Sequence, residues 1–203
     1  MRPISRPQYT GNTITQYKSY LSYLIDAYGN YCSYCERTDK VDVEHIVPTS
    51  HNADLELEWS NLILGCPRCN RDFKRNKNES RAGYIWPDTH NTYNLLQYHT
   101  DGRVEPISNL PEALKSQVQN TLDLVCLDDS GQPQKPLCLG RRNAFQMANI
   151  IKDNYIRENQ TLDEVCIFAK GNYWSVWYTV FYSIPEVKTA LENLLPNTDI
   201  QRV

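Results

Sequence analysis

Two Cys-x-x-Cys pairs constrain the fold of this chain more than any other feature. Cys32 and Cys35 form the first pair, and Cys66 and Cys69 form the second. Each pair forms a tight turn that can present two thiolates, and a closed tetrahedral shell of thiolates is typical of structural zinc. Four unrelated buried cysteines are the alternative, but the repeated spacing favours a metal. The sequence therefore predicts one structural Zn²⁺ held by these four residues.

The remaining cysteines indicate no disulfide framework. Seven cysteines are an odd number, and in a reducing compartment such a set is not read as disulfides. The three isolated ones are expected in the hydrophobic core, since cysteine packs as a small apolar residue; they are Cys126, Cys138 and Cys166. The start of the chain lacks an apolar signal region, and no apolar run approaches the roughly 18 residues of a membrane span. We therefore expect a cytoplasmic protein without membrane contact.

The segment between and after the cysteine pairs carries a second pattern. Residues 41–48 alternate as a strand does, with Glu44 and His45 side by side before Pro48. Asn61 precedes the second cysteine pair and Asn70 follows it directly. A helix from Asn70 would bring Lys74 onto the same face. The order is thus an acid with histidine, an asparagine, a second asparagine and a lysine.

That order resembles the HNH, or ββα-metal, nucleases, in which two antiparallel strands and a helix surround one divalent ion. Many members brace the unit with zinc on two Cys-x-x-Cys pairs. The resemblance implies that His45 is the general base, that Asn61 fixes the histidine loop, and that Glu44 and Asn70 bind the catalytic ion. In the family Asp is common where Glu44 stands, and His is common where Asn70 stands. Oxygen ligands suit Mg²⁺ or Mn²⁺.

Each of these roles has a structural alternative. His45 could be a buried structural histidine, Glu44 an exposed strand residue with Asp42 as reserve ligand, and Asn70 a helix cap. Asn61 could belong to an ordinary turn. Two further polar features are expected to be loop elements rather than site residues, namely His51 and the run Asp88-Thr89-His90-Asn91.

Charge limits how the protein can hold nucleic acid. The chain has 21 basic and 24 acidic residues, a net charge of −3 and a pI of about 5.8. A surface that binds nucleic acid throughout would be basic, so contact must be local. The most basic segment adjoins the HNH pattern and predicts contacts to phosphates of a nucleic acid, DNA before RNA, unless it is only a solvated helix face. Its expected contact residues are Arg68, Arg71, Lys74, Arg75 and Lys77.

The expected fold is α+β, with a zinc-braced ββα-metal unit embedded in a mostly helical domain. Residues 1–30 are expected to form an N-terminal arm and helix, residues 31–78 the nuclease core, and residues 79–203 a mostly helical region. Within these parts an extended or loosely ordered arm is expected at 1–13, and the first helix at 14–28 with Gly29 as its stop. Short strands are expected at 83–86 and 103–106. Helices are expected at 111–126, 139–156, 161–169 (with a Thr161–Glu164 capping box) and 185–195. The apolar and aromatic segment 175–183 favours a helix, with a strand as the alternative.

Wider features resemble the HNH proteins of Septu and certain retron anti-phage systems, the PtuB group. They include Arg2-Pro3-Ile4 and the segments 31–36, 43–48 and 59–70. Weaker signals are Gly102, residues 121–124 and Arg141-Arg142. The resemblance implies a defence nuclease working with an ABC-type ATPase (PtuA), possible also within a retron complex. The aromatic stretch 173–182 could then be a docking surface or core. The alternative function is a non-catalytic zinc module that binds nucleic acid or protein.

Overall fold

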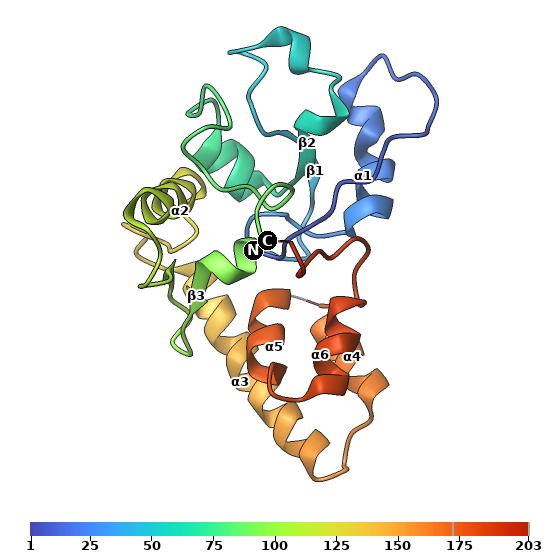
Figure 1. Ribbon diagram of the computed structural model, residues 1–203, viewed down its shortest axis with the longest axis vertical. Helices are drawn as coiled ribbons and strands as arrows, with labels where there is room; N and C mark the ends of the chain where they lie inside the picture. The colour runs from blue at the N-terminus through green and yellow to red at the C-terminus, as the bar shows by residue number, and fades with distance from the viewer. Residues whose placement is uncertain (172, 203) are drawn as a thin grey trace.

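A computed structural model describes residues 1–171 and 173–202. Figure 1 shows two parts, with β1, β2, α1 and α2 in the upper half and helices α3 to α6 in the lower half. The observed mixture of helices and two small two-stranded sheets fits the α+β expectation. Within the described residues, no helix has both the length and the apolar character required to cross a membrane.

The first residues of the chain are packed into the fold rather than loosely ordered. Met1 and Ile4 are fully buried, and Ile4 forms a β-bridge with Thr198 near the other end of the chain. The buried Arg2 guanidinium donates to Tyr31 Oη at 2.7 Å and to the carbonyls of Tyr28 and Pro196 at 2.5 and 3.0 Å. Arg2 therefore ties the first helix to the C-terminal segment.

The first helix is shorter than expected. A 3-10 turn, η1 (Tyr17–Tyr20), leads into α1 (Leu21–Tyr28). Gly29 ends the helix with φ +90°, as the sequence predicts from the conformational freedom of glycine. Leu24 and Tyr28 are fully buried, so α1 packs with the face that its apolar periodicity indicates.

The expected ββα unit is present, with an unexpected helix type. Strand β1 (Asp42–His45) pairs antiparallel with β2 (Leu62–Gly65), so that Glu44 lies opposite Ile63. The short 3-10 turns η2 (Ala53–Leu55) and η3 (Trp59–Asn61) lie in the connection. The helical element η4 (Arg68–Lys74) is a π-helix, and Arg75 N–H donates to the Asn70 carbonyl at 2.7 Å. Such wide turns are frequent at functional sites.

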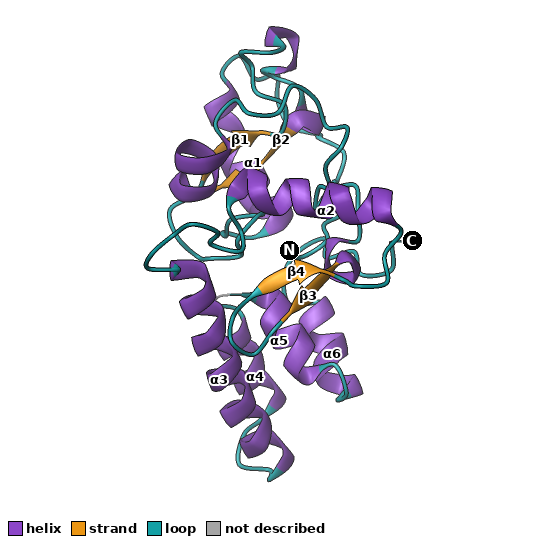
Figure 2. Ribbon diagram, turned by 90° about the vertical axis from the view of Figure 1, so that its left-hand side faces the viewer, coloured by secondary structure: helices purple, strands orange, loops and turns teal. Residues whose placement is uncertain are grey.

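A second hairpin joins the two parts of the molecule. After η5 (Thr92–Leu95), strand β3 (Leu96–Tyr98) pairs antiparallel with β4 (Val104–Pro106), and Figure 2 shows this hairpin between α2 and α5. The strand expected at 103–106 is confirmed, whereas residues 83–86 form turns and loop. Helix α2 (Glu112–Val125) confirms the helix expected at 111–126 and contacts η4.

The helices of the lower half follow the sequence closely. They are α3 (Pro136–Ile156), α4 (Leu162–Ala169), α5 (Trp174–Phe181) and α6 (Pro185–Glu192). The capping box of α4 is present, with Thr161 Oγ1 accepting from Glu164 N–H at 3.3 Å. Most of the aromatic stretch 173–182 is α5, which is almost wholly buried, so its side chains are core; only Tyr182 is strongly exposed.

Two hydrophobic cores divide the chain inside α3. The first core runs from Met1 to Leu137 and includes the ββα unit and α2, and the second runs from Phe145 to Leu191. The region expected to be one helical lobe from residue 79 therefore contributes to both cores. Of the isolated cysteines, Cys126 and Cys138 are buried as expected, while Cys166 is only partly covered.

Gly102 and Arg141 make the close contact that connects the second hairpin to α3. The buried Arg141 Nε donates to the Gly102 carbonyl at 2.7 Å. Gly102 has φ +89°, and a Cβ added there would lie 1.8 Å from the Cys138 carbonyl oxygen. Only glycine meets both conditions, because a side chain would clash with backbone that cannot move alone.

We expect Gly102→Ala to lower the free energy of unfolding much more than Gly131→Ala does. Gly131 also has positive φ (+69°), but nothing lies within 4 Å of its added Cβ. The control should therefore show only the left-handed penalty of about 1–2 kcal/mol. Urea unfolding of both variants measures the difference; equal losses would contradict the steric argument.

Candidate active site and zinc centre

The four paired cysteines lie together and are buried. Their sulfur atoms all lie within 4.8 Å of one another, and Cys35 Sγ is 3.8 Å from Cys66 Sγ. A tetrahedral ion with Zn–S bonds of about 2.3 Å places its ligand sulfurs about 3.8 Å apart. The thiols of Cys32, Cys35 and Cys69 lower the pKa of Cys66 by hydrogen bonding to it. This donor set fits a structural Zn²⁺.

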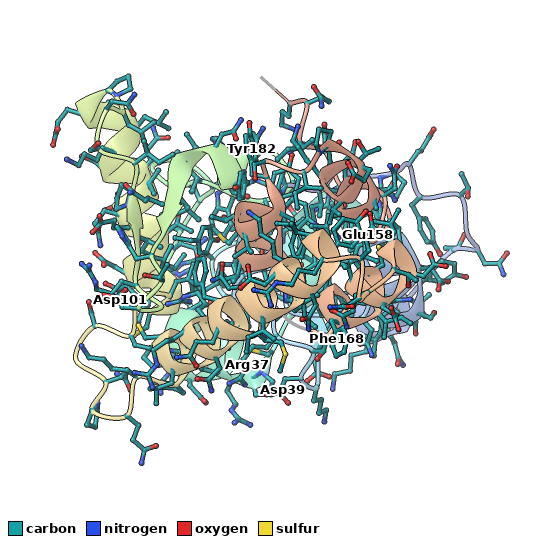
Figure 3. All side chains as sticks on the ribbon, turned by 90° about the horizontal axis from the view of Figure 1, so that it is seen from below. Arg37, Asp39, Asp101, Glu158, Phe168 and Tyr182 are labelled. Atoms are coloured by element: carbon teal, nitrogen blue, oxygen red, sulfur yellow. The ribbon has the colours of Figure 1, made fainter. Side chains whose placement is uncertain are left out.

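Residues within or next to each cysteine pair reach other parts of the fold. Glu36, directly after Cys35, accepts hydrogen bonds from Ser175 N–H at 3.0 Å and Ser175 Oγ at 2.6 Å. Arg68, between Cys66 and Cys69, donates to the Cys126 carbonyl at 2.9 Å and to Asp129 at 2.5 Å. Figure 3 shows Arg37 and Asp39, which follow Glu36, on the side of the molecule where Phe168 of α4 lies.

His45 stands at the end of β1 with an imidazole that can act as a base. Its Nε2 lies 3.0 Å from the Glu56 carbonyl oxygen, which can only accept, so Nε2 carries the proton and Nδ1 is the available acceptor. Burial lowers the pKa of His45, which keeps the ring neutral at physiological pH. The Tyr17 ring packs edge-on against it at 4.7 Å between centroids.

Three side chains hold three consecutive backbone carbonyls of the histidine loop. Lys74 Nζ donates to the His45 carbonyl and Asn78 Nδ2 to the Ile46 carbonyl, both at 2.8 Å. Asn61 Nδ2 donates to the Val47 carbonyl at 2.9 Å, and Asn61 Oδ1 accepts from Val47 N–H at 2.8 Å. Asn61 thus has the geometry expected of a loop-fixing residue. Sequence reasoning missed Asn78, although its place in the basic segment, close after Lys74, was visible.

Glu44 and Lys74 form a buried ion pair under the hairpin. Glu44 Oε1 lies 2.9 Å from Lys74 Nζ, and the two side chains are 3% and 1% exposed. The same oxygen accepts from Tyr34 Oη at 3.4 Å. Burial raises the pKa of Glu44, and the Lys74 ammonium offsets only part of this effect. The Glu44 carboxylate is thus paired with one cation of the protein, the Lys74 ammonium.

Gly65 lets Glu44 and Asn70 approach each other on one face of the hairpin. A Cβ added to Gly65 would lie 3.0 Å from Glu44 Cβ and 3.3 Å from Asn70 Cβ. Asn70 also lines a pocket together with Asp42, the expected reserve ligand. The Glu44 and Asn70 side chains therefore begin side by side at the gap that a side chain at residue 65 would fill. These residues fit a hard divalent ion such as Mg²⁺ or Mn²⁺.

Two of the expected phosphate contacts are directed into the protein. Lys74 is buried beside Glu44, and the Arg68 side chain is only 12% exposed and engaged by α2 and Asp129. Neither can reach a phosphate in this conformation, which corrects the sequence-based expectation. Arg71, Arg75 and Lys77 are exposed and keep that possibility.

The other polar features expected to be loop elements have structural contacts. The buried Asp88 accepts from Arg6 at 2.7 Å and from Arg81 at 2.5 Å. Although burial acts to raise the pKa of Asp88, these hydrogen bonds and charges bring it below its usual value. Arg6 and Arg81 in turn donate to carbonyls of residues 59–62, so Asp88 braces the segment that contains Asn61. The exposed His51 contacts the Asn76 carbonyl at 2.7 Å.

The segment that carries these residues is similar to a known protein family. The family model of HNH endonucleases matches residues 32–75. No curated protein matches the chain. The matched HNH segment contains both cysteine pairs, the hairpin and η4, and such a domain indicates metal-dependent nuclease activity on nucleic acid. The structure adds a helical part, α3 to α6, that lies outside the match.

We expect Lys74→Met to destabilise the protein by about 3–5 kcal/mol, because it leaves the Glu44 carboxylate buried without its ionic partner. Lys77→Met is the control, since Lys77 is exposed and its loss should cost under about 0.5 kcal/mol. Denaturant unfolding provides the measurement. Adding Glu44→Gln to Lys74→Met should recover part of the loss; no recovery would argue against the ion pair.

The purified protein should contain one zinc ion per chain, and Cys35→Ser should lose it. Because the four thiols close two loops around one centre, loss of the ion should also lower the melting temperature. Elemental analysis and thermal unfolding measure both effects. Cys166→Ser, which changes a cysteine outside the cluster, should keep its zinc. Full metal retention in Cys35→Ser would exclude the proposed ligand set.

Proposed function

We propose that the protein is a metal-dependent endonuclease that hydrolyses phosphodiester bonds in nucleic acid, DNA before RNA. The observation that carries the proposal is His45, whose ring is oriented by the Glu56 carbonyl while Nδ1 stays available as an acceptor. A neutral histidine in this state can take a proton from an attacking water. The HNH match over residues 32–75 supports the same reaction class.

Each site residue has a separate role in the proposed reaction. His45 accepts the proton of water at Nδ1, and Asn61 holds the loop that carries His45 through both of its Val47 hydrogen bonds. Glu44 and Asn70 would hold a Mg²⁺ or Mn²⁺ ion, with Asp42 beside Asn70 as a further oxygen donor. Such an ion, when bound, relieves negative charge on the phosphate and on the leaving oxygen. The exposed Arg71, Arg75 and Lys77 would hold neighbouring phosphates.

A biological setting is a second step of the proposal. The sequence features that resemble the PtuB group support a role in anti-phage defence beside an ABC-type ATPase. The net charge of −3 is consistent with a partner that helps to bring nucleic acid to the site.

The test is nicking of plasmid DNA, with an RNA substrate in parallel, in Mg²⁺, Mn²⁺ or EDTA. We expect metal-dependent cleavage that His45→Ala reduces by about 10²–10⁴-fold, the usual contribution of a general base. His99→Ala is the matched control, because His99 is a histidine of the β3–β4 turn that pairs with Glu105.

Both variants must keep the zinc content and unfolding midpoint of the wild type. Equal cleavage by His45→Ala would overturn the assigned base. If the wild type cleaves neither substrate, with or without an ABC-type ATPase and ATP, the nuclease proposal fails and a zinc-containing binding module becomes the better description.

A further inference from the structure

A pocket of about 460 Å³ opens beside the HNH site between η1, the start of β1 and η4. Its polar lining comes from three separate segments of the chain, with Tyr17 and Lys18 on η1, Lys40 and Asp42 at the start of β1, and Asn70 on η4. The pocket therefore depends on the packing of the first helix against the nuclease unit.

The pocket lies next to His45, the proposed base. Tyr17 lines the pocket and packs its ring 4.7 Å from that of His45. Val43 lines it as well, and by strand alternation Val43 lies on the same face of β1 as His45. Asn70, the proposed metal ligand, closes the pocket from η4. A group bound there would lie next to the reacting centre.

Two lysines give this pocket its charge. Lys18 and Lys40 are exposed, and in the part of the chain that the structure describes neither ammonium group makes an ion pair or a side-chain hydrogen bond. Asp42 is the acid in the lining, so the ammonium groups outnumber it. Two unpaired ammonium groups in the lining of one pocket suit an anionic ligand.

We propose that this pocket binds a backbone phosphate of the nucleic acid strand that flanks the cleaved bond, with Lys18 and Lys40 as its ligands. The inference rests on the proposed nuclease function. It extends substrate binding to Lys18 of η1, which lies outside the HNH match at residues 32–75, whereas Lys40 lies within that match. The exposed Arg71, Arg75 and Lys77, which follow Asn70 in the chain, would hold further phosphates of the same strand.

The experiment measures binding of a fluorescently labelled DNA duplex by anisotropy, without added divalent ion, in the His45→Ala background that cannot cleave. Lys18→Ala/Lys40→Ala should raise Kd about tenfold at low salt. It should also reduce the slope of log K against log salt by about 1, because one phosphate contact is lost. Lys18→Arg/Lys40→Arg should restore both, whereas Asp42→Asn should tighten binding.

The control is Arg157→Ala/Lys170→Ala, which removes two exposed cations from the helical part far along the chain. All variants are checked for zinc content and unfolding midpoint. If the Lys18/Lys40 variant binds like this control while the wild type cleaves DNA, the pocket proposal is wrong and the nuclease proposal stands. If the wild type neither cleaves nor binds nucleic acid at low salt, both proposals fail together.

Discussion

The cluster of four thiols is the constraint on which the rest of the structure depends. It joins the chain before β1 to the chain after β2, so one ion would fix both ends of the hairpin. Glu36, next to Cys35, accepts two hydrogen bonds from Ser175 and so connects the cluster to the first turn of α5. Arg68, between Cys66 and Cys69, donates hydrogen bonds to the end of α2 and to Asp129. The Asp129 carboxylate in turn accepts from the N–H groups of Leu137 and Cys138 at the start of α3. The helical part is thereby connected at two places to the segments that carry the cysteine pairs. Loosening of the thiol cluster would therefore destabilise both hydrophobic cores.

The position of the loop that follows His45 is fixed by a separate set of hydrogen bonds. Lys74, Asn78 and Asn61 donate to the carbonyls of residues 45, 46 and 47 in order, so the backbone after His45 has little freedom. Lys74 also forms an ion pair with Glu44, which links the position of His45, the proposed base, to that of the proposed metal ligand. Catalytic groups held by the hydrogen bonds of surrounding residues need little reorganisation during a reaction. The basic segment after the second cysteine pair is thus partly a scaffold.

The sequence predicts local features well and long-range partners poorly. The cysteine spacing, the alternation around Glu44 and the Thr161 capping box each depend on a few neighbouring residues, and each has its counterpart in the structure. The interior roles of Lys74 and Arg68 could not be predicted, because charge alone does not show that Glu44 and Asp129 lie within reach. The π-helix was missed for a related reason, since its wide turn has no distinct periodicity in seven residues. The buried start of the chain is another case, because the contacts of Arg2 are with Tyr31, Tyr28 and the far C-terminal segment.

The distribution of positive charge limits how strongly the protein alone can hold its proposed substrate. With Arg68 and Lys74 used inside the fold, the proposed phosphate contacts are reduced to five exposed residues in a chain with a net charge of −3, namely Lys18, Lys40, Arg71, Arg75 and Lys77. Each phosphate contact adds about 0.9 to the salt dependence of binding to duplex DNA, so a small number of contacts gives weak binding that salt readily abolishes. Such a nuclease would be inactive on most nucleic acid that it meets by chance. A second source of affinity, such as the proposed ATPase partner, would then determine where and when cleavage occurs, and a site that binds weakly by itself is suited to that control.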